Sequence, residues 1–490
     1  MNDRNPHGWV DASLAEIGMT KTEGINPSTL PNNTFELWSV PSFPTGEPEI
    51  VVGASVGSNK QKVNPNDVLL CKINPRINRV WKVEEKNRHE QIASTEWIVF
   101  RNSFLDADFL TWRFREKRFR EELCADVTGV GGSLTRARPQ TVKKIIVSLP
   151  PLNEQKRIVM KIEALQERSR NAREALAEVP KLVEQFKQLV LAAAFRGDLT
   201  KAWREQNPDI EPAEKLIERI RIERRQKWEA DQLAAFKAKG KTPPNNWQSK
   251  YKEPSSIATA ESPGTPVGWR QLTFGDLFDF KGGSQPPKST FISEPEEGYI
   301  RLLQIRDFKS DKYPAYIKDA DKWPKCTEKD IMVGRYGASV GQILSGMSGA
   351  YNVALVKLLY PEGNLSRGWV WYLLQSDVFQ HPLKLLSRSA QNGFNKNELA
   401  IFPITLPPVD EQGQIATRIE SLFAYADSIQ EQAKASLEEL DRLDQSILAK
   451  AFRGELVPQG PTDEPASALL ERIKAERAAA TPVRKKRKRQ

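Results

Sequence analysis

Two short stretches each occur twice in the chain, and together they decide the fold. LPPLNEQ at 149–155 is matched by LPPVDEQ at 406–412, and AFRGDL at 194–199 is matched by AFRGEL at 451–456. The offset is 257 residues from Pro150 to Pro407 and again from Phe195 to Phe452, so the sequence between the two motifs aligns without a gap. A fixed offset of this kind indicates a structural unit that is repeated.

The repeat extends in both directions from these motifs. PHGW at 6–9 matches PVGW at 266–269, and EPA at 211–213 matches EPA at 464–466. The chain therefore reads as block, helix, block, helix, with related edges in both halves.

The segment between the two motifs is predicted to be a long helix in each half. Apolar and small residues recur at alternating spacings of four and three from Ile158 to Ala193, and in the same register from Ile415 to Ile447, which is typical of a coiled-coil seam. Each helix would run roughly 60 Å. Pro180 predicts a kink or a break in the first. The other copy is the expected antiparallel partner of each seam; a separate protein or a homodimer is the alternative.

The remaining sequence forms two blocks with short β-type runs, such as 68–73 and 354–359, separated by Gly, Pro and Asn turns. We therefore predict an α+β fold in which two mixed α/β globular domains are separated by two long helices that pair as an antiparallel coiled coil with a pseudo-two-fold internal repeat. The expected divisions are a first block at 1–150, a central helical region at 151–240, a linker at 241–265, a second block at 266–405, a distal helical region at 406–478 and a basic, disordered tail at 479–490.

Composition limits the class of protein. The 73 Lys and Arg exceed the 63 Asp and Glu, giving a formal net charge of +10 over 490 residues, which fits a polyanionic partner. The N-terminus lacks the apolar core of a signal peptide, no apolar run is long enough to span a membrane, and the three cysteines lie far apart. We expect a cytoplasmic protein without a membrane association.

The sequence offers no recognisable catalytic motif. There is no GxxxxGK[ST] phosphate loop, no GxGxxG after a strand, and no metal-ligand spacing among the three histidines. We therefore predict no catalytic residue and no metal site in this chain; an unrecognised carboxylate cluster of a nuclease is the alternative.

With these motifs in both halves, the chain resembles the specificity subunit of type I restriction–modification enzymes. The residues that carry the resemblance are the paired PxGW starts, the paired LPPxxEQ helix entrances, the AFRG exits and the trailing EPA segments. The resemblance covers almost the whole chain. It implies that each block is a target recognition domain and that the helices are a spacer between them.

The resemblance also implies partners and cofactors. Double-stranded DNA would be the ligand, two modification (methyltransferase) subunits that hold S-adenosylmethionine would dock on the two helical regions, and restriction subunits that use ATP and Mg would join them. No cofactor would be bound by this chain itself. Because the two blocks share little sequence beyond their edges, the DNA site would be bipartite and asymmetric.

A DNA reader needs Arg or Lys for phosphates and guanine edges, and Asn or Gln for adenine edges, presented on loops. In each block, one loop follows a short strand and another precedes the final strand into LPP. A third loop, at 281–285, is specific to block 2. The candidate DNA-binding residues are Lys72, Asn74, Arg76, Asn78, Arg79, Arg136 and Arg138 in block 1, and Lys281, Gln285, Arg335, Tyr336, Arg388, Asn392, Asn395 and Lys396 in block 2.

Two residue pairs from the repeat are interpreted as structural. Trp9 and Trp269 are expected to pack in the core, and the Glu-Gln pairs at 154–155 and 411–412 are expected in the first helical turn. Two other functions remain open from the residues alone: a stand-alone sequence-specific DNA-binding protein such as a repressor, and a coiled-coil adaptor that binds only protein.

Overall fold

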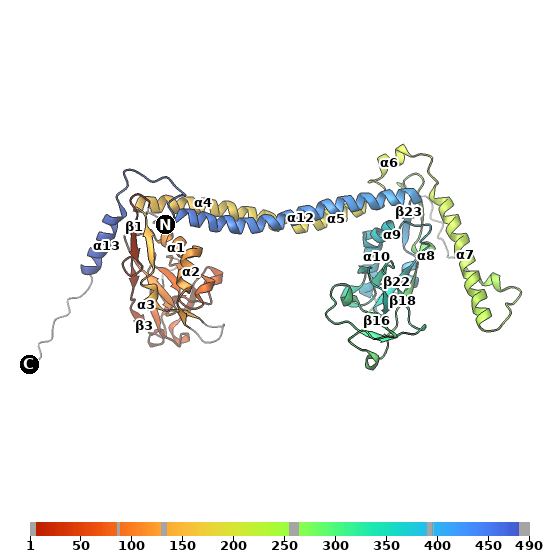
Figure 1. Ribbon diagram of the computed structural model, residues 1–490, viewed down its shortest axis with the longest axis horizontal. Coiled ribbons are helices and arrows are strands. Elements are labelled where there is room, and N and C mark those ends of the chain that lie inside the picture. The colour runs from red at the N-terminus through yellow and green to blue at the C-terminus, as the bar shows by residue number, and fades with distance from the viewer. Residues whose placement is uncertain are drawn as a thin grey trace, which may run out of the picture. The chain divides into compact units, whose positions relative to one another are not determined.

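The chain folds as two compact units. The computed structural model describes residues 6–85, 89–128, 135–253, 264–389, 394 and 396–479. Unit 1 consists of Met1–Ala177 with Ala433–Gln490, and unit 2 consists of Glu178–Gln432. Each unit holds one block together with a stretch of both long helical segments (Figure 1).

Block 1 in unit 1 is built from small sheets. Strands β1 (Val10–Ser13) and β13 (Ile146–Leu149) pair antiparallel. A four-stranded sheet has the order β2 (Met19–Thr20), β10 (Trp97–Phe100), β7 (Val68–Cys71), β8 (Val80–Lys82). A five-stranded sheet has the order β3 (Gly24–Ile25), β6 (Lys60–Lys62), β9 (Glu90–Ser94), β4 (Thr34–Trp38), β5 (Glu49–Val52). The other elements are β11 (Val127–Thr128), β12 (Arg136–Ala137), α1 (Ala107–Arg115), α2 (Lys117–Cys124) and α3 (Pro139–Val142).

Block 2 in unit 2 repeats part of this plan. Strands β14 (Arg270–Thr273) and β23 (Pro403–Leu406) pair antiparallel. One four-stranded sheet has the order β15 (Asp279–Gly282), β22 (Leu355–Leu359), β19 (Met332–Gly334), β20 (Ile343–Leu344). Another has the order β17 (Tyr316–Lys318), β16 (Tyr299–Leu303), β21 (Gly349–Tyr351), β18 (Lys325–Cys326). The helices are α8 (Phe274–Leu277), α9 (Arg367–Gln375), α10 (Asp377–Ser389) and α11 (Lys396–Ala400).

The part of each block next to the helices is the part that repeats. The order β2-β10-β7-β8 corresponds to β15-β22-β19-β20, and each sheet is antiparallel throughout. Helices α1 and α2 follow β10 as α9 and α10 follow β22. The remaining sheets differ in strand number and order, and in Figure 1 their labelled strands β3 and β16 lie at the end of each block away from the helices.

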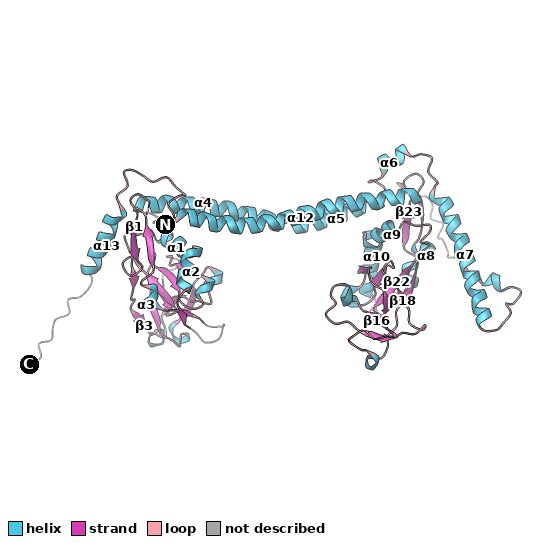
Figure 2. Ribbon diagram, viewed as in Figure 1, coloured by secondary structure: helices cyan, strands magenta, loops and turns pink. Residues whose placement is uncertain are grey.

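The long helical stretches pair antiparallel within each unit (Figure 2). In unit 1, α4 (Leu152–Ala177) packs against the second half of α12 (Val409–Ala451): Ile158 and Ile162 share a core with Ile447. In unit 2, α5 (Val179–Phe195) packs against the first half of α12, so that Val190 shares a core with Ile415 and Ile419.

Ion pairs accompany both seams. Arg173 lies 2.7 Å from Asp444 in unit 1, and Lys187 lies 2.5 Å from Asp427 in unit 2. The predicted antiparallel coiled coil and the α+β fold class are confirmed.

Pro180 divides the first long helix as predicted. Helix α4 ends at Ala177, and α5 begins at Val179 with Pro180 in its first turn. A proline there has no lost hydrogen bond, because the first helical N–H groups have no partner inside the helix. The second helix has no proline and continues without a break through 43 residues.

Each helical stretch is followed by shorter helices, α6 (Lys201–Gln206) and α7 (Ala213–Ala238) in unit 2 and α13 (Ala466–Ala479) in unit 1. A 3₁₀ turn at Trp247–Lys250 lies inside the range predicted as a linker. Residues 254–263 of that range, and 480–490 of the predicted tail, lie outside the described residues. No helix within the described ranges has the length and apolarity that a membrane crossing needs.

Candidate nucleic-acid interface

The predicted loops of the two blocks occupy the same place in the repeated sheet. Lys72, Asn74, Arg76, Asn78 and Arg79 lie in the connection from β7 to β8. Arg335 and Tyr336 lie in the connection from β19 to β20, which holds the equivalent position in block 2. The two loops differ in sequence although their supporting strands correspond.

The structure brings the two predicted loops of block 1 together. The Asn74 backbone N–H donates to the carbonyl of Thr135 at 2.7 Å, and Asn74 Oδ1 accepts from the Thr135 N–H at 3.0 Å. The Ala137 N–H donates to the carbonyl of Lys72 at 2.8 Å. Segments more than 60 residues apart in sequence therefore form one basic surface on block 1.

Two asparagines shape this loop as well as adding polar groups to it. Asn74 and Asn78 have φ of 47° and 54°, a left-handed conformation that asparagine tolerates better than most residues. Asn78 also donates from its amide to the carbonyl of Arg115 at 3.1 Å. Both side chains thus hold the loop in place.

The arginines of block 1 are exposed at residues 76, 136 and 138, whereas Lys72 and Arg79 are half-buried. Arg136 pairs with Glu96 at 3.1 Å, and the Glu96 carbonyl accepts from the Lys72 N–H at 3.0 Å. The sequence reading missed Glu96, because a single acid in a strand connection carries no pattern that would link it to a loop 40 residues away.

In block 2 the candidates gather around β15. Lys281 is exposed at its end, and its carbonyl accepts from the Tyr351 hydroxyl at 3.1 Å. Arg335 stacks over the Tyr336 ring at 5.1 Å, and Lys396 pairs with Asp279 at the start of β15, at 3.3 Å. Tyr351 and Asp279 were also missed, since neither falls in a turn motif.

Of the other block 2 candidates, the structure describes the side chain of Gln285. Gln285 is exposed and donates to the carbonyl of Pro286 at 3.3 Å. Asn392 and Asn395 lie outside the described residues, as does the side chain of Arg388.

The repeated tryptophans and glutamates mount each block on its helix. The Trp9 indole donates to Glu154 Oε1 at 3.1 Å, and the Trp269 indole donates to Glu411 Oε2 at 2.8 Å. All four residues are buried, as expected for the tryptophans. The glutamates lie in the first turn as predicted, and their partner is an indole across the block–helix junction.

The neighbouring glutamines complete the junction. Gln155 accepts from the Asp106 N–H at 3.0 Å and donates to the Pro150 carbonyl at 2.9 Å. Gln412 accepts from the Ser366 N–H at 2.9 Å and donates to the Pro407 carbonyl at 3.1 Å. The same buried amide therefore ties the equivalent helix start, α1 or α9, to the long helix in both units.

The two junctions differ in how the glutamate is satisfied. Glu411 also accepts from Thr200 Oγ1 at 2.6 Å and from Arg204. Glu154 has Trp9 as its side-chain donor while its Oε2 has no partner among the described residues. Burial raises the pKa of Glu154, an effect that the Trp9 hydrogen bond opposes.

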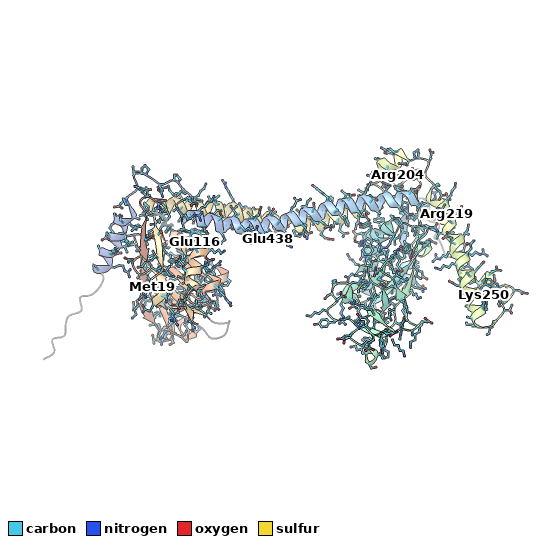
Figure 3. All side chains as sticks on the ribbon, viewed as in Figure 1. Met19, Glu116, Arg204, Arg219, Lys250 and Glu438 are labelled. Atoms are coloured by element: carbon cyan, nitrogen blue, oxygen red, sulfur yellow. The ribbon has the colours of Figure 1, made fainter. Side chains whose placement is uncertain are left out.

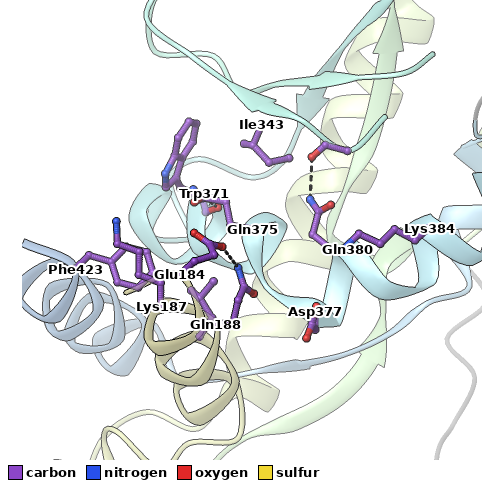
Figure 4. Close-up of a pocket in the computed structure, with 12 residues that line it drawn as sticks. Glu184, Lys187, Gln188, Ile343, Trp371, Gln375, Asp377, Gln380, Lys384 and Phe423 are labelled. Atoms are coloured by element: carbon purple, nitrogen blue, oxygen red, sulfur yellow. Dashed lines mark hydrogen bonds between the residues drawn. The ribbon is translucent and has the colours of Figure 1, made fainter. Parts of the chain in front are cut away.

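A polar pocket of 680 Å³ lies where block 2 meets the helices (Figure 4). Glu184, Lys187 and Gln188 of α5 form one wall, and Trp371, Gln375 and Gln380 of α9 and α10 lie opposite. Gln380 donates to the carbonyl of Gly341 at 2.8 Å. The lining contains neither a histidine nor a cysteine, and within the described residues no cluster of three metal-ligating side chains occurs.

The helix pair of unit 2 also carries an exposed apolar stripe. Leu182 and Leu189 on α5 and Tyr425 on α12 are 57%, 68% and 65% exposed. In the seam register they occupy the same flank of the pair, and the seam residues Phe186 and Ile429 between them are also partly exposed. Block 2 packs on the opposite flank, where Phe423 meets Tyr372.

The structure thus shows two different mixed α/β blocks that are attached to the long helices through equivalent junctions. Comparisons with known proteins agree. The family model described as "Type I restriction modification DNA specificity domain" matches residues 266–439. The chain is 24% identical to the type I restriction enzyme EcoKI specificity subunit of Escherichia coli K12, over 97% of this chain and 96% of that protein. It is 28% identical to the EcoDI specificity subunit of Escherichia coli, over 76% and 78%.

Two solved structures share the fold. The HsdS subunit from Thermoanaerobacter tengcongensis matches with a TM-score of 0.59 at 23% identity, covering 92% of this chain and 98% of that one. A chain from a study of complex assembly in a type I restriction–modification system matches with a TM-score of 0.62 at 24% identity, covering 92% and 100%. Over almost its whole length, this chain is similar to the specificity subunits of type I restriction–modification systems, and residues 266–439 match the DNA specificity domain of that family.

Proposed function

We propose that the chain reads a bipartite, asymmetric DNA site, one half with each block. The observation that carries this proposal is the division inside each block. The sheet that is mounted on the helices repeats, whereas the distal sheet and the loop sequences differ. Two unlike blocks on equivalent helix junctions suit two unlike half-sites separated by a fixed gap. In smaller DNA-binding proteins, the geometry of the dimer sets the half-site spacing in the same way.

The candidate residues would fall into three groups: phosphate contacts, base-edge contacts and residues that shape the loop. Exposed Arg76, Arg138 and Lys281 suit phosphate contacts, which position a protein on the duplex without reading sequence. Arg335, stacked on Tyr336, presents a planar fork that suits a guanine edge. Asn74 and Asn78 would act mainly by shaping the loop, because one polar side-chain atom of each already bonds within the protein.

The chain would act as a scaffold rather than as a catalyst. Two modification subunits carrying S-adenosylmethionine would dock on the helical regions, and restriction subunits using ATP and Mg would join them in the cytoplasm. The exposed stripe of Leu182, Leu189 and Tyr425 supports a protein partner, since an aliphatic and aromatic row at helical spacing is typical of helix-to-helix docking.

Single-molecule sequencing of DNA from cells that express the chain with the modification subunit tests the proposal. We expect a methylated motif of two unlike short halves with a fixed unspecified gap, which disappears when this chain is deleted. A continuous palindromic motif, or methylation that persists without the chain, would contradict it.

A further inference from the structure

Helix α7 of unit 2 continues past the residues that correspond to the described part of α13 in the repeat. The EPA motifs are offset by 253 residues from Pro212 to Pro465, so α13 (Ala466–Ala479) corresponds to residues 213–226. Helix α7 continues to Ala238, about three turns further. The extra turns and the chain that follows them, residues 227–253, are here called the arm.

The arm is a folded hairpin. Helix α7 ends at Ala238, and Gly240 just beyond it has a φ of +61°. The Lys241 N–H donates back to the Phe236 carbonyl at 2.9 Å. The chain then returns, so that the Trp247 ring stacks on Trp228 at 5.8 Å and Tyr251 packs at 5.4 Å from Trp228. Three aromatic rings therefore fix the returning segment to the helix, within a range that the sequence predicted as a linker.

The root of the arm is attached to block 2. Arg224 donates to the carbonyls of Gly275 and Asp276 at 2.9 and 3.0 Å, and the Asn364 amide donates to Glu223 at 2.6 Å. The arm is thus positioned by the same block that carries Lys281 and Arg335.

The charge of the arm has one sign over most of its length. No acidic residue occurs between Asp231 and Glu253, whereas this interval contains five exposed lysines, Lys237, Lys239, Lys241, Lys250 and Lys252. Figure 3 labels Lys250 in the returning segment and Arg219 nearer the root of α7. Within the described residues, no ion pair joins these lysines to an acid.

The second repeat has a basic stretch in the corresponding place. RKKRKR at 484–489 follows α13 as the lysine-rich hairpin follows the matching part of α7. These residues lie outside the described ranges, so the correspondence is one of sequence order. A basic segment after the same helix in both halves favours a shared polyanionic ligand over a chance run of surface charge.

We propose that the arm binds the phosphate backbone of DNA beside the half-site that block 2 reads, and that it adds affinity without sequence preference. The inference rests on the proposed function. Lysine ammonium groups are compact point charges that suit phosphates, and they lack the planar fork of an arginine that reads base edges. Because the hairpin is already folded, less conformational entropy is lost when the lysines of the arm are held on the duplex.

The test compares the full chain, assembled with the modification subunit, with the variant K237Q/K239Q/K241Q. Dissociation constants are measured for a duplex containing the methylated motif and for one lacking it, over a series of salt concentrations. Each phosphate contact contributes about 0.9 to the slope of log K against log salt, so the slope should fall by about 2 to 3. The ratio of specific to non-specific affinity should not change.

The charge-retaining variant K237R/K239R/K241R is the matched control and should keep the wild-type slope. An unchanged slope in the glutamine variant overturns the arm proposal while leaving the proposed function intact. Loss of the modification subunit at an unchanged slope identifies a protein contact instead and also overturns it. If the wild-type assembly shows no preference for any bipartite motif, the proposed function itself fails.

Discussion

At the scale of single residues, the repeat contains a matched pair of buried carboxylates with different surroundings. Glu411 accepts from Trp269, Thr200 and Arg204, whereas Glu154 accepts from Trp9. A buried charge is stabilising only where its donors are complete. The two equivalent glutamates should therefore contribute unequally to stability.

We expect Glu411→Gln to destabilise unit 2 by about 3 kcal/mol, because it leaves the half-buried Arg204 without its charged partner. Glu154→Gln should cost less than about 1 kcal/mol, since it removes a carboxylate that lacks a second donor. Thermal unfolding of the full-length variants, with hydrogen exchange to assign each change to a unit, measures the difference. Equal costs at both sites would contradict this account.

A second residue-scale prediction concerns base recognition by Arg335. Arg335→Lys keeps the charge but loses the stacked, planar fork, so discrimination at one base pair of one half-site should fall by about 1 to 3 kcal/mol. Methylation rates on duplexes with single base changes give the measurement.

The matched control for Arg335 is Arg306→Lys, because Arg306 is also stacked on a tyrosine in block 2, at 6.0 Å from Tyr313, and is not a candidate. It should leave the motif unchanged. A motif that survives intact in Arg335→Lys would remove Arg335 from the base-reading residues.

At the scale of elements, the two helix pairs present different flanks. The stripe residues Leu182 and Leu189 correspond, at the 257-residue offset, to Glu439 and Ser446 in unit 1. Apolar area at exposed helical positions is stabilising only when a partner covers it. The stripe of unit 2 should therefore hold a partner subunit more tightly than the equivalent flank of unit 1.

The variant L182Q/L189Q tests this element. We expect it to weaken docking of the modification subunit at unit 2 at least tenfold, so that native mass spectrometry detects assemblies with one such subunit fewer. Both leucines are exposed, so the helix pair should keep its fold. E439Q/S446Q is the matched control and should assemble normally; the same stoichiometry in both variants would count against the stripe.

At the scale of the whole molecule, each block should set one half-site independently of the other, because each block is attached to the helices through its own junction. Replacing residues 10–147 with the block of another specificity subunit, between the retained PHGW and LPP edges, should change one half of the methylated motif. The other half should be preserved, because Trp269, Glu411 and Gln412 of the second junction are untouched. Sequencing of methylated DNA reads both halves at once, and a change in both would refute independent mounting.

The antiparallel pairing of the two long helices was favoured by the sequence but left open against a separate partner. The repeat, the two long helices and a kink or a break at Pro180 were determined by the sequence itself. These features are periodic or are repeated motifs, so local spacing contains them. It also located the β7–β8 and β19–β20 loops, because Gly, Pro and Asn mark turns. The resemblance to type I specificity subunits followed from the same motifs, and the comparisons show the same similarity.

Only the tertiary structure decided which distant residues meet. The contact of Asn74 with Thr135, the pairing of Arg136 with Glu96, and the indole of Trp269 on Glu411 join residues from 40 to 142 positions apart. The stacking of Trp247 on Trp228 likewise holds part of the range predicted as a linker in a hairpin. Such contacts depend on how strands and helices close in space, and no local pattern encodes that closure.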